Sequence, residues 1–367
     1  MSSVLNVSVN KKPAYDIVIE RDFDKLAGEI EKLGLTERKF MIVTDDIVSP
    51  IYADKVKTAL GVDEAGIFVH AFKAGEKSKN MDTVIDILKD MTDKKFNRKD
   101  VVIALGGGVV GDVAGFAAAI YMRGIAVIQI PTSLLAQVDS SVGGKTGVDL
   151  DEYKNMVGAF KMPALVYINT SVLSTLDARQ YYAGMAEVMK YGLIMDGAFY
   201  EWLLGKMYEI HDKDADTLEE MIEHCCACKQ RIVERDPLEQ GDRALLNFGH
   251  TIGHAIEKYK GFSLLHGECV ALGSVAAAYI SWKKDRLSMD EYYEIRDMFV
   301  PFNLPISVDD VDPEEIIKLT RSDKKAESDG IKFILLKKVG KAVIDKSVTE
   351  KEMFEALNEI IFTEDGE

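Results

Sequence analysis

Three of the six histidines in the chain lie in one short stretch, NFGHTIGHAIEKYKGFSLLHGE, at residues 247–268. His250 and His254 are four positions apart and would share one face of a helix. Imidazole nitrogens bind zinc, and a catalytic zinc usually has three protein ligands and one open position. The stretch therefore predicts a metal site, but spacing alone leaves open whether His250, His254 and His266 are all ligands.

A second group of residues could bind phosphate. The stretch VVIALGGGVVGDVAGFAAAIYM is typical of a strand, a glycine turn and a helix, and Gly106, Gly108 and Gly111 match G-x-G-x-x-G. Such glycines let the backbone approach a pyrophosphate at the helix N-terminus. The motif follows the fourth predicted strand, and the next strand, ending at Pro131, has no acidic residue for a ribose hydroxyl. A simple tight turn is therefore the alternative.

Other polar loops could contribute to the same site. Glu76 and Lys79 lie in KAGEKSKN, directly after a predicted strand. Thr132 and Ser133 follow another strand at its carboxyl end, where α/β sheets bind ligands. Lys145 follows two glycines in VGGKTG, which is suitable for an anion although it lacks Walker spacing. Taken alone, KAGEKSKN is more typical of a solvated loop, and a turn without a functional role is the alternative for VGGKTG.

The elements that would position these residues change character near residue 178. The first part alternates β-branched runs with helical patterns, which indicates βαβ units and a mainly parallel sheet covered on both faces. The later part is mostly helical and ends in a small hairpin. We expect a Rossmann-like α/β nucleotide-binding domain over residues 1–178 and a mostly helical domain, binding metal and substrate, over 179–367. The predicted strands are 15–20, 39–46, 65–72, 101–107, 125–133 and 164–170; the predicted helices include 24–34, 81–95, 178–194, 218–234, 245–259 and 269–285, and the hairpin is 332–348.

Composition limits the functional class. The 367 residues are more than one hydrophobic core usually supports, and the formal net charge of −16 argues against nucleic acid or an anionic membrane as partner. The N-terminus lacks the pattern of a signal peptide, and no apolar run is long enough to span a membrane. We expect a cytoplasmic protein whose small anionic ligand would need basic residues gathered locally.

Three of the four cysteines are clustered in HCCACK, where Cys225 and Cys228 form a C-x-x-C. Half a zinc site or a redox pair is one interpretation. The flanks form one amphipathic helical pattern and the sequence has no second C-x-x-C. Reduced structural thiols are therefore the favoured interpretation, as expected in the cytosol.

Several long motifs occur together in a fixed order, and with their spacing they closely resemble the 3-dehydroquinate synthase family of sugar-phosphate cyclases. The resemblance extends from about residue 15 to about residue 345. It implies a homodimer that uses NAD+ and zinc, with a nucleotide-binding α/β domain, a helical domain and an active site between them. The motifs are GGGVVGDVAGFAAA, PTSLLAQVDSSVGGKTG, KNMVGAF, GMAEVMKYGLI, RALLNFGHTIGHAIE and LHGECVALG.

The resemblance divides the roles among the histidines. It implies that Glu187, His250 and His266 are the metal ligands and that His254 faces the substrate and relays protons. Glu187 lies in an apolar helical pattern, where an unpartnered carboxylate would be costly to bury, which also favours a ligand role. Glu268 is expected to act at a helix start or behind the ligands. Zinc and cobalt both suit this ligand set.

The resemblance also implies a set of residues that bind the anionic substrate. One of them, Arg123, would reach the phosphate across the dimer. A lysine of RSDKK should contact substrate, and we take it to be Lys324, with Lys325 as the alternative. The remaining substrate residues are Lys145, Asn155, Lys190, Lys229, Arg243 and Asn247.

For NAD+, the resemblance implies residues from several loops of the first domain. Asp45 could supply the ribose-binding acid that is missing after Gly111, with Asp46 as the alternative. The family usually has Pro-Thr-Thr where this chain has Pro-Thr-Ser, which keeps the hydroxyl at Ser133. The full set is Asp45, Gly75, Glu76, Lys79, Gly107, Gly108, Val109, Val110, Gly111, Asp112, Thr132, Ser133, Asp139, Lys145, Lys154, Val172, Leu173, Ser174 and Thr175.

The implied reaction converts 3-deoxy-D-arabino-heptulosonate 7-phosphate into 3-dehydroquinate and phosphate, the second step of the shikimate pathway. It would proceed by transient oxidation with NAD+, phosphate elimination with the leaving phosphate as base, re-reduction, ring opening and an aldol closure. One alternative is a different sugar-phosphate cyclase, such as a 2-deoxy-scyllo-inosose synthase. Others are a metal-dependent polyol dehydrogenase, which would release NADH, and an inactive nucleotide-binding protein.

Overall fold

The computed structural model describes residues 3–151, 153–322 and 331–362. The described chain forms two compact units: one comprises Met1–Leu176 and Lys213–Leu238, and the other Asp177–Asp212 and Glu239–Glu367. The first change of unit falls close to the expected boundary at residue 178. The segment Lys213–Leu238, however, belongs to the first unit, whereas the sequence placed it in the helical domain.

Within the described residues, seven strands of the first unit form one sheet in the order β1-β2-β9-β6-β5-β3-β4. Only β1 runs antiparallel to its neighbour, and the other strands are parallel to one another. The predicted mainly parallel, Rossmann-like sheet is therefore confirmed. The strands are β1 (Ser3–Val9), β2 (Lys12–Glu20), β3 (Phe40–Asp45), β4 (Ile67–Phe72), β5 (Val101–Gly106), β6 (Ala126–Pro131) and β9 (Leu165–Asn169).

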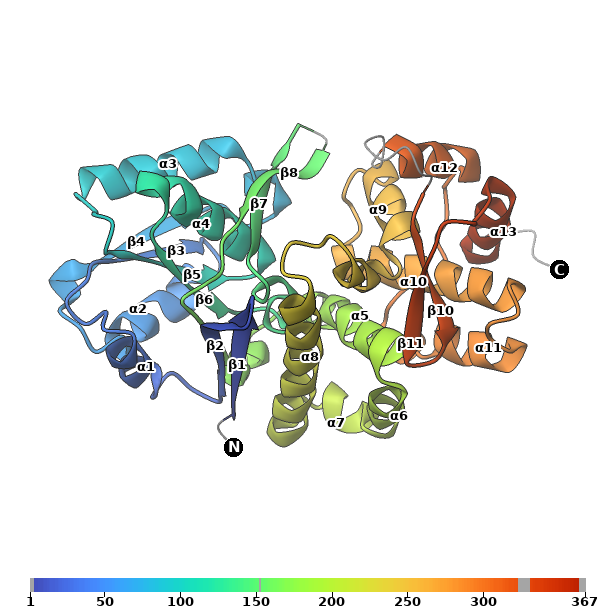
Figure 1. Ribbon diagram of the computed structural model, residues 1–367, viewed down its shortest axis with the longest axis horizontal. Helices are drawn as coiled ribbons and strands as arrows, with labels where there is room; N and C mark the ends of the chain where they lie inside the picture. The colour runs from blue at the N-terminus through green and yellow to red at the C-terminus, as the bar shows by residue number, and fades with distance from the viewer. Residues whose placement is uncertain (1–2, 152, 323–330, 363–367) are drawn as a thin grey trace. The chain divides into compact units, whose positions relative to one another are not determined.

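Helices cover both faces of this sheet because alternate side chains of each buried strand point to opposite faces. In β5, Ile103 packs in a cluster with Leu26 and Tyr52, which come from α1 and α2. Val102 packs in another cluster with Ile87 and Val113, which come from α3 and α4. Figure 1 shows α1 and α2 on one side of the sheet and α3 and α4 on the other. These helices are α1 (Leu26–Lys32), α2 (Ser49–Ala59), α3 (Met81–Asp93) and α4 (Gly108–Ile120).

Among the features of the first unit that were not predicted are a hairpin after residue 144 and the surface that the predicted helix 218–234 covers. A hairpin of β7 (Lys145–Leu150) and β8 (Tyr153–Phe160) follows the glycines of VGGKTG. Helix α8 (Ala215–Arg235) packs on β1, β2 and the short helical turns at Ala136–Ser140 and Thr170–Ser174. Its apolar face marks it as amphipathic, but such a face carries no information about which unit it covers.

The second unit is built around one buried helix, α10 (His266–Lys283), which contacts α5, α9, α11, α13 and β10. Its glycines allow backbone contact: a Cβ built on Gly273 would lie 1.8 Å from the Gly249 carbonyl oxygen. The predicted hairpin is confirmed, with Gly340 at φ +80° in its turn. The other elements are α5 (Ala178–Met195), α6 (Gly197–Gly205), α7 (Met207–His211), α9 (His250–Tyr259), α11 (Met289–Asp297), α12 (Pro313–Ser322), α13 (Glu350–Ile360), β10 (Phe333–Lys338) and β11 (Lys341–Asp345).

Candidate functional site

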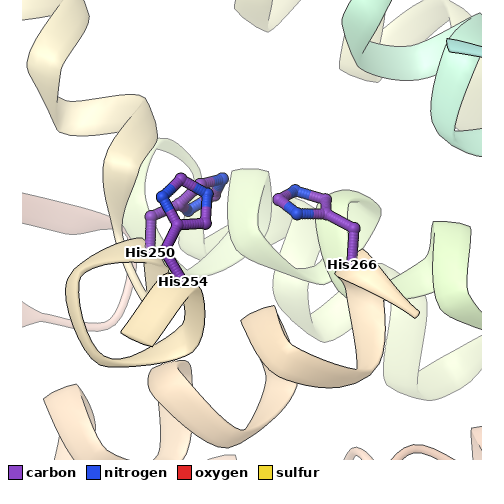
Figure 2. Close-up of side chains that lie close together, drawn as sticks. All are labelled: His250, His254 and His266. Atoms are coloured by element: carbon purple, nitrogen blue, oxygen red, sulfur yellow. The ribbon is translucent and has the colours of Figure 1, made fainter. Parts of the chain in front are cut away.

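The second unit gathers the three histidines around one position. Donor atoms of His250, His254 and His266 all lie within 4.8 Å of one another. Figure 2 shows the rings of His250 and His254, from α9, facing the ring of His266 at the start of α10. The tight cluster predicted from the sequence is therefore present, and it joins two helices separated by a loop.

Glu187 of α5 completes this cluster from beneath the histidines. Its Oε1 atom lies 3.4 Å from His250 Nε2 and 3.4 Å from His266 Nε2. The side chain is 1% exposed and its other oxygen forms an ion pair with Lys190, one turn along the same helix. The three side chains proposed as ligands thus converge on a common point.

The electrostatics of Glu187 suit a metal ligand. Burial would raise the pKa of its carboxyl, but the Lys190 charge and hydrogen bonds from His250 and His266 hold that pKa well below its usual range. Burial likewise opposes protonation of His266, yet Glu187 and Glu257 raise the pKa of His266 to about 9. The buried Glu187 carboxylate is therefore ionised, and the positive charges of Lys190 and His266 compensate it. A bound metal cation could take over part of this compensation.

The outer nitrogens of the two histidines have partners of their own. His250 Nδ1 lies 2.9 Å from the Phe248 carbonyl oxygen, so that Nε2 is the ring nitrogen that faces Glu187. His266 Nδ1 lies 3.7 Å from Glu257 Oε2. The donor set of imidazole nitrogens and one carboxylate oxygen fits Zn²⁺ or Co²⁺. His254 lies among the same rings, so distance alone does not separate it from the ligands.

The local sequence explains how the rings come together. Gly249 precedes His250 at φ +79°, and a Cβ there would lie 2.5 Å from Ser274 Oγ on α10. A glycine is therefore required both for the backbone turn into α9 and for the close approach of α9 to α10. Glu268 accepts the Leu265 N–H at 2.8 Å and so begins α10, the helix-start role expected of it.

In the first unit, the glycine turn lies between β5 and α4. Gly107 is the residue before α4, and a Cβ on Gly108 would lie 3.1 Å from Ser140 Oγ. A Cβ on Gly111 would lie 2.9 Å from Gln129 Oε1 on β6. Close packing therefore explains why Gly108 and Gly111 are glycines, as in the helix–strand packing of dinucleotide-binding turns. The same turn still presents backbone N–H groups at the start of α4.

Lys79 connects several of the predicted nucleotide-site residues. Its Nζ lies 2.7 Å from Asp112 Oδ2 and donates to Asn155 Oδ1 at 2.6 Å. Burial opposes its charge, but Asp112 and Glu76 raise the pKa of Lys79 to about 12. Lys154 pairs with Glu76 at 3.1 Å. The glycine-turn helix, the loop after β4 and the β7–β8 hairpin are therefore held together by one charged network.

A further lysine joins this unit from α8. Lys229 Nζ lies 3.0 Å from Asp139 Oδ1 and donates to the Asp139 carbonyl oxygen at 2.5 Å. Asp139 lies in a single turn of π-helix, a form that is frequent at functional sites. Lys229 was expected in the helical domain but belongs to the first unit, where it lies beside Asp139 of the predicted nucleotide site.

Asp45 ends β3 with its side chain turned onto the following loop. Its Oδ1 accepts the N–H groups of Ile47 and Val48 at 3.0 and 2.8 Å. Burial raises the pKa of Asp45 despite these hydrogen bonds. Asp46 instead accepts the Ala74 N–H at 2.7 Å. Both carboxylates shape their loops, and the choice between them as ribose-binding acid stays a prediction.

The remaining predicted residues are placed as follows. Gly75 adopts φ +108° and Arg123 φ +71°, a left-handed conformation that is uncommon outside glycine. Ser133 Oγ accepts the Ala136 N–H at 3.3 Å. Arg243 is 1% exposed in the second unit, where Asn247 donates to Glu239 Oε1 at 3.2 Å. Lys324 and Lys325 lie outside the described residues. Val109, Val110, Thr132, Lys145, Val172, Leu173, Ser174 and Thr175 all belong to the first unit.

Two charged residues near the metal cluster were missed. Glu257 lies on α9 behind His266, and Arg179 lies in the first turn of α5 and pairs with Glu268. The sequence could have indicated Glu257, because this carboxylate lies in the apolar helical pattern of residues 245–259, one turn after His254. No local pattern could have indicated Arg179, because its partner Glu268 lies 89 positions away in sequence.

Two known protein families match successive parts of the chain. The family described as 3-dehydroquinate synthase N-terminal matches residues 69–183, and that described as 3-dehydroquinate synthase C-terminal matches residues 184–326. The 3-dehydroquinate synthase of Thermoanaerobacter pseudethanolicus is 43% identical over 349 residues, which cover 95% of this chain and 98% of that protein. That of Ruminiclostridium cellulolyticum is 42% identical over 331 residues, covering 90% and 92%.

Solved structures of related cyclases have the same fold. A 2-epi-5-epi-valiolone synthase from Streptomyces hygroscopicus subsp. jinggangensis, with NAD+ and Zn2+ bound, matches with a TM-score of 0.86 at 26% identity and covers 97% of this chain and 99% of its own. A 2-deoxy-scyllo-inosose synthase with carbaglucose-6-phosphate, NAD+ and Co2+ matches with a TM-score of 0.85 at 26% identity, covering 98% and 100%. A probable glycerol dehydrogenase from Sinorhizobium meliloti shares the fold alone, with a TM-score of 0.63 at 14% identity and coverage of 93% and 95%. With two family matches over most of its length and relatives above 40% identity, this chain belongs to the 3-dehydroquinate synthase family.

Proposed function

We propose that the protein catalyses the 3-dehydroquinate synthase reaction, in which 3-deoxy-D-arabino-heptulosonate 7-phosphate is converted to 3-dehydroquinate and phosphate. The observation that carries this proposal is the convergence of His250 Nε2 and His266 Nε2 on Oε1 of the buried Glu187, each at 3.4 Å. A glycine turn suited to a pyrophosphate lies at the start of α4. Family membership then selects the cyclase reaction among those that such groups could support.

The metal would be held by Glu187, His250 and His266. When bound, a Zn2+ or Co2+ ion supplies Lewis-acid polarisation of a substrate hydroxyl. His254 lies beside the ligands, with its ring centroid 5.1 Å from that of His250, and we assign it to proton relay rather than ligation. The related synthases solved with Zn2+ or Co2+ support this choice of metals.

NAD+ would bind in the first unit at the glycine turn. When bound, NAD+ would supply reversible hydride acceptance, for which no net consumption of the cofactor is expected. Gly107 and Gly108, at the start of α4, would hold the pyrophosphate through their backbone N–H groups. Asp45, Thr132 and Ser133 would contribute from the ends of neighbouring strands.

The substrate would be bound by basic side chains that the structure already fixes in place. Lys190 and Lys229 are almost fully buried and paired with Glu187 and Asp139, which holds both side chains in a defined orientation. In an acidic chain, such oriented basic side chains are what a substrate with a phosphate and a carboxylate needs. Arg123, Lys145, Asn155, Arg243, Asn247 and Lys324 complete the proposed substrate set.

With the leaving phosphate acting as base, the protein's own contribution is to position the substrate and to stabilise charge. Within the described residues, no helix is both long enough and apolar enough to cross a membrane. A homodimer in the cytoplasm, serving the shikimate pathway, is part of the same proposal.

The test is phosphate release from the heptulosonate phosphate with catalytic NAD+ and added Zn2+. We expect turnover that exceeds the amount of NAD+, without net NADH. A need for stoichiometric NAD+ would indicate a polyol dehydrogenase instead. Because the similar solved structures include other cyclases, glucose 6-phosphate and sedoheptulose 7-phosphate serve as alternative substrates. A preference for glucose 6-phosphate or sedoheptulose 7-phosphate over the heptulosonate phosphate would overturn the proposed reaction. Full metal content in the His250→Ala variant would overturn the proposed metal site.

A further inference from the structure

A bidentate ion pair connects the two helices that supply Glu187 and His266. Arg179 lies in the first turn of α5 and Glu268 in the first turn of α10. Arg179 Nε lies 2.6 Å from Glu268 Oε1, and Nη2 lies 2.7 Å from Oε2. This parallel arrangement fixes the orientation of both side chains as well as their separation.

The pair also organises the chain around His266. Glu268 Oε2 accepts the backbone N–H of Leu265 at 2.8 Å, and Arg179 Nη2 donates to the Ser263 carbonyl oxygen at 3.4 Å. Both contacts act on the segment immediately before His266. The arginine on α5 therefore sets where α10 begins, and with it the position of the His266 backbone.

A backbone contact beside the pair leaves little freedom between the helices. A Cβ built on Gly267 would lie 1.9 Å from the Ala183 carbonyl oxygen of α5. This contact lies one helical turn before Glu187 and next to His266. Together, the ion pair and the glycine contact fix the start of α10 against α5 at two points.

We propose that Arg179 is a positioning residue that, through Glu268, holds His266 in register with Glu187 for metal binding. The proposal rests on the metal site of the proposed function. The Arg179 side chain is 55% exposed and that of Glu268 only 11%, so this bidentate pair also contributes to stability, and metal affinity is the readout that separates positioning from stabilisation. Partners behind metal ligands influence metal affinity, typically by about 10–100-fold.

The experiment measures Co2+ affinity of the full-length, metal-stripped protein from the visible absorption of bound cobalt. We expect Arg179→Met to weaken binding by about 10–100-fold and to alter the cobalt spectrum. Arg179→Lys keeps the charge but not the planar fork, so its affinity should fall between those of wild type and Arg179→Met. The matched control is Arg286→Met, which removes another arginine–carboxylate pair of the same unit, with Asp345, away from the ligands. Arg286→Met should bind cobalt as tightly as wild type.

Arg179→Met with wild-type affinity and spectrum would overturn the proposal. An equal loss in Arg286→Met would do the same, because it would reveal a general effect of stability. If Arg179→Met does not fold, the Glu268→Gln variant provides the test. It keeps an acceptor for the Leu265 N–H but removes the negative charge that Arg179 binds. Wild-type cobalt affinity in Glu268→Gln would also refute the proposal. Failure of the metal site itself is distinguishable: wild type would not bind cobalt, or His250→Ala would bind it unchanged.

Discussion

Replacing Gly273 with alanine should push α9 and α10 apart and weaken the metal site between them. The Cβ of the new residue would lie 1.8 Å from the Gly249 carbonyl oxygen and 2.8 Å from the Gly253 nitrogen. Both neighbours are backbone atoms and have no rotamer that avoids the contact. The helices must therefore separate, and they carry His250 and His266.

The size of the effect follows from this geometry. Ordinary contact begins near 3.4 Å, so the helices must move apart by about 1.6 Å at this point. Overpacking of this kind costs about 1–3 kcal/mol, and the gain in helix propensity from glycine to alanine offsets up to about 1 kcal/mol. Because a shift of this size falls at the upper end of the overpacking cost, we expect a net loss of about 2 kcal/mol in the unit's stability. Metal affinity should fall at least about tenfold, because a displacement of this size exceeds the tolerance of metal–ligand distances.

The assays are thermal unfolding of the metal-free protein and cobalt titration of the folded protein. Gly205→Ala is the control, because Gly205 lies on a helix of the same unit and a Cβ there meets nothing within 4 Å. It should be neutral or slightly stabilising and should bind cobalt normally. If Gly273→Ala matches Gly205→Ala in both measurements, the claim that backbone contact sets the histidine spacing is wrong.

Further predictions concern charge and metal. Lys79→Met should leave Asp112 without its ammonium partner, and we expect a loss of about 2–3 kcal/mol in stability. It should also weaken NAD+ binding as measured by titration calorimetry. Unchanged NAD+ affinity would contradict the proposed role of the charged network around Lys79. Burial would raise the pKa of Asp345, but Ser347 and Arg286 lower it, so this carboxylate stabilises the fold above the pKa of the unfolded chain and stops doing so as pH falls through its folded pKa. Asp345→Asn should therefore be less stable than wild type at neutral pH, with the difference shrinking in unfolding scans below about pH 4; a constant difference would refute the linkage. Removal of the metal with a chelator should abolish phosphate release, and Zn2+ or Co2+ should restore it, whereas activity in excess chelator would exclude a catalytic metal.

Hydrophobic patterning predicted the parallel sheet well, because buried strands such as 101–107 are apolar throughout. It missed β1, although the residues there alternate between polar and apolar. The turn that pairs β1 with β2 uses Asn10 and Lys11 at φ +53° and +63°, without the glycine that usually marks a two-residue hairpin. Local sequence carried too weak a turn signal to reveal the pairing.

The site was predictable to the extent that its residues share a local motif. His250 and His254 are found by spacing, and Glu187 and His266 follow from family resemblance. The unit to which Lys229 belongs was not predictable, because an amphipathic helix does not identify the surface that it covers. Arg179 was missed for a similar reason: its partner is distant in sequence, and exposed arginines are common.

The interrupted course of the first unit has a consequence for synthesis on the ribosome. The sheet ends by Leu176, yet α8, which covers β1 and β2, is completed only near Leu238. At typical translation rates the intervening chain of about 60 residues takes roughly 3–12 s to appear. During that interval the nascent sheet exposes an apolar surface while part of the second unit has already emerged. The first unit therefore cannot complete its fold until Leu238 has emerged, and aggregation or chaperone binding is most expected while residues 177–238 are being synthesised.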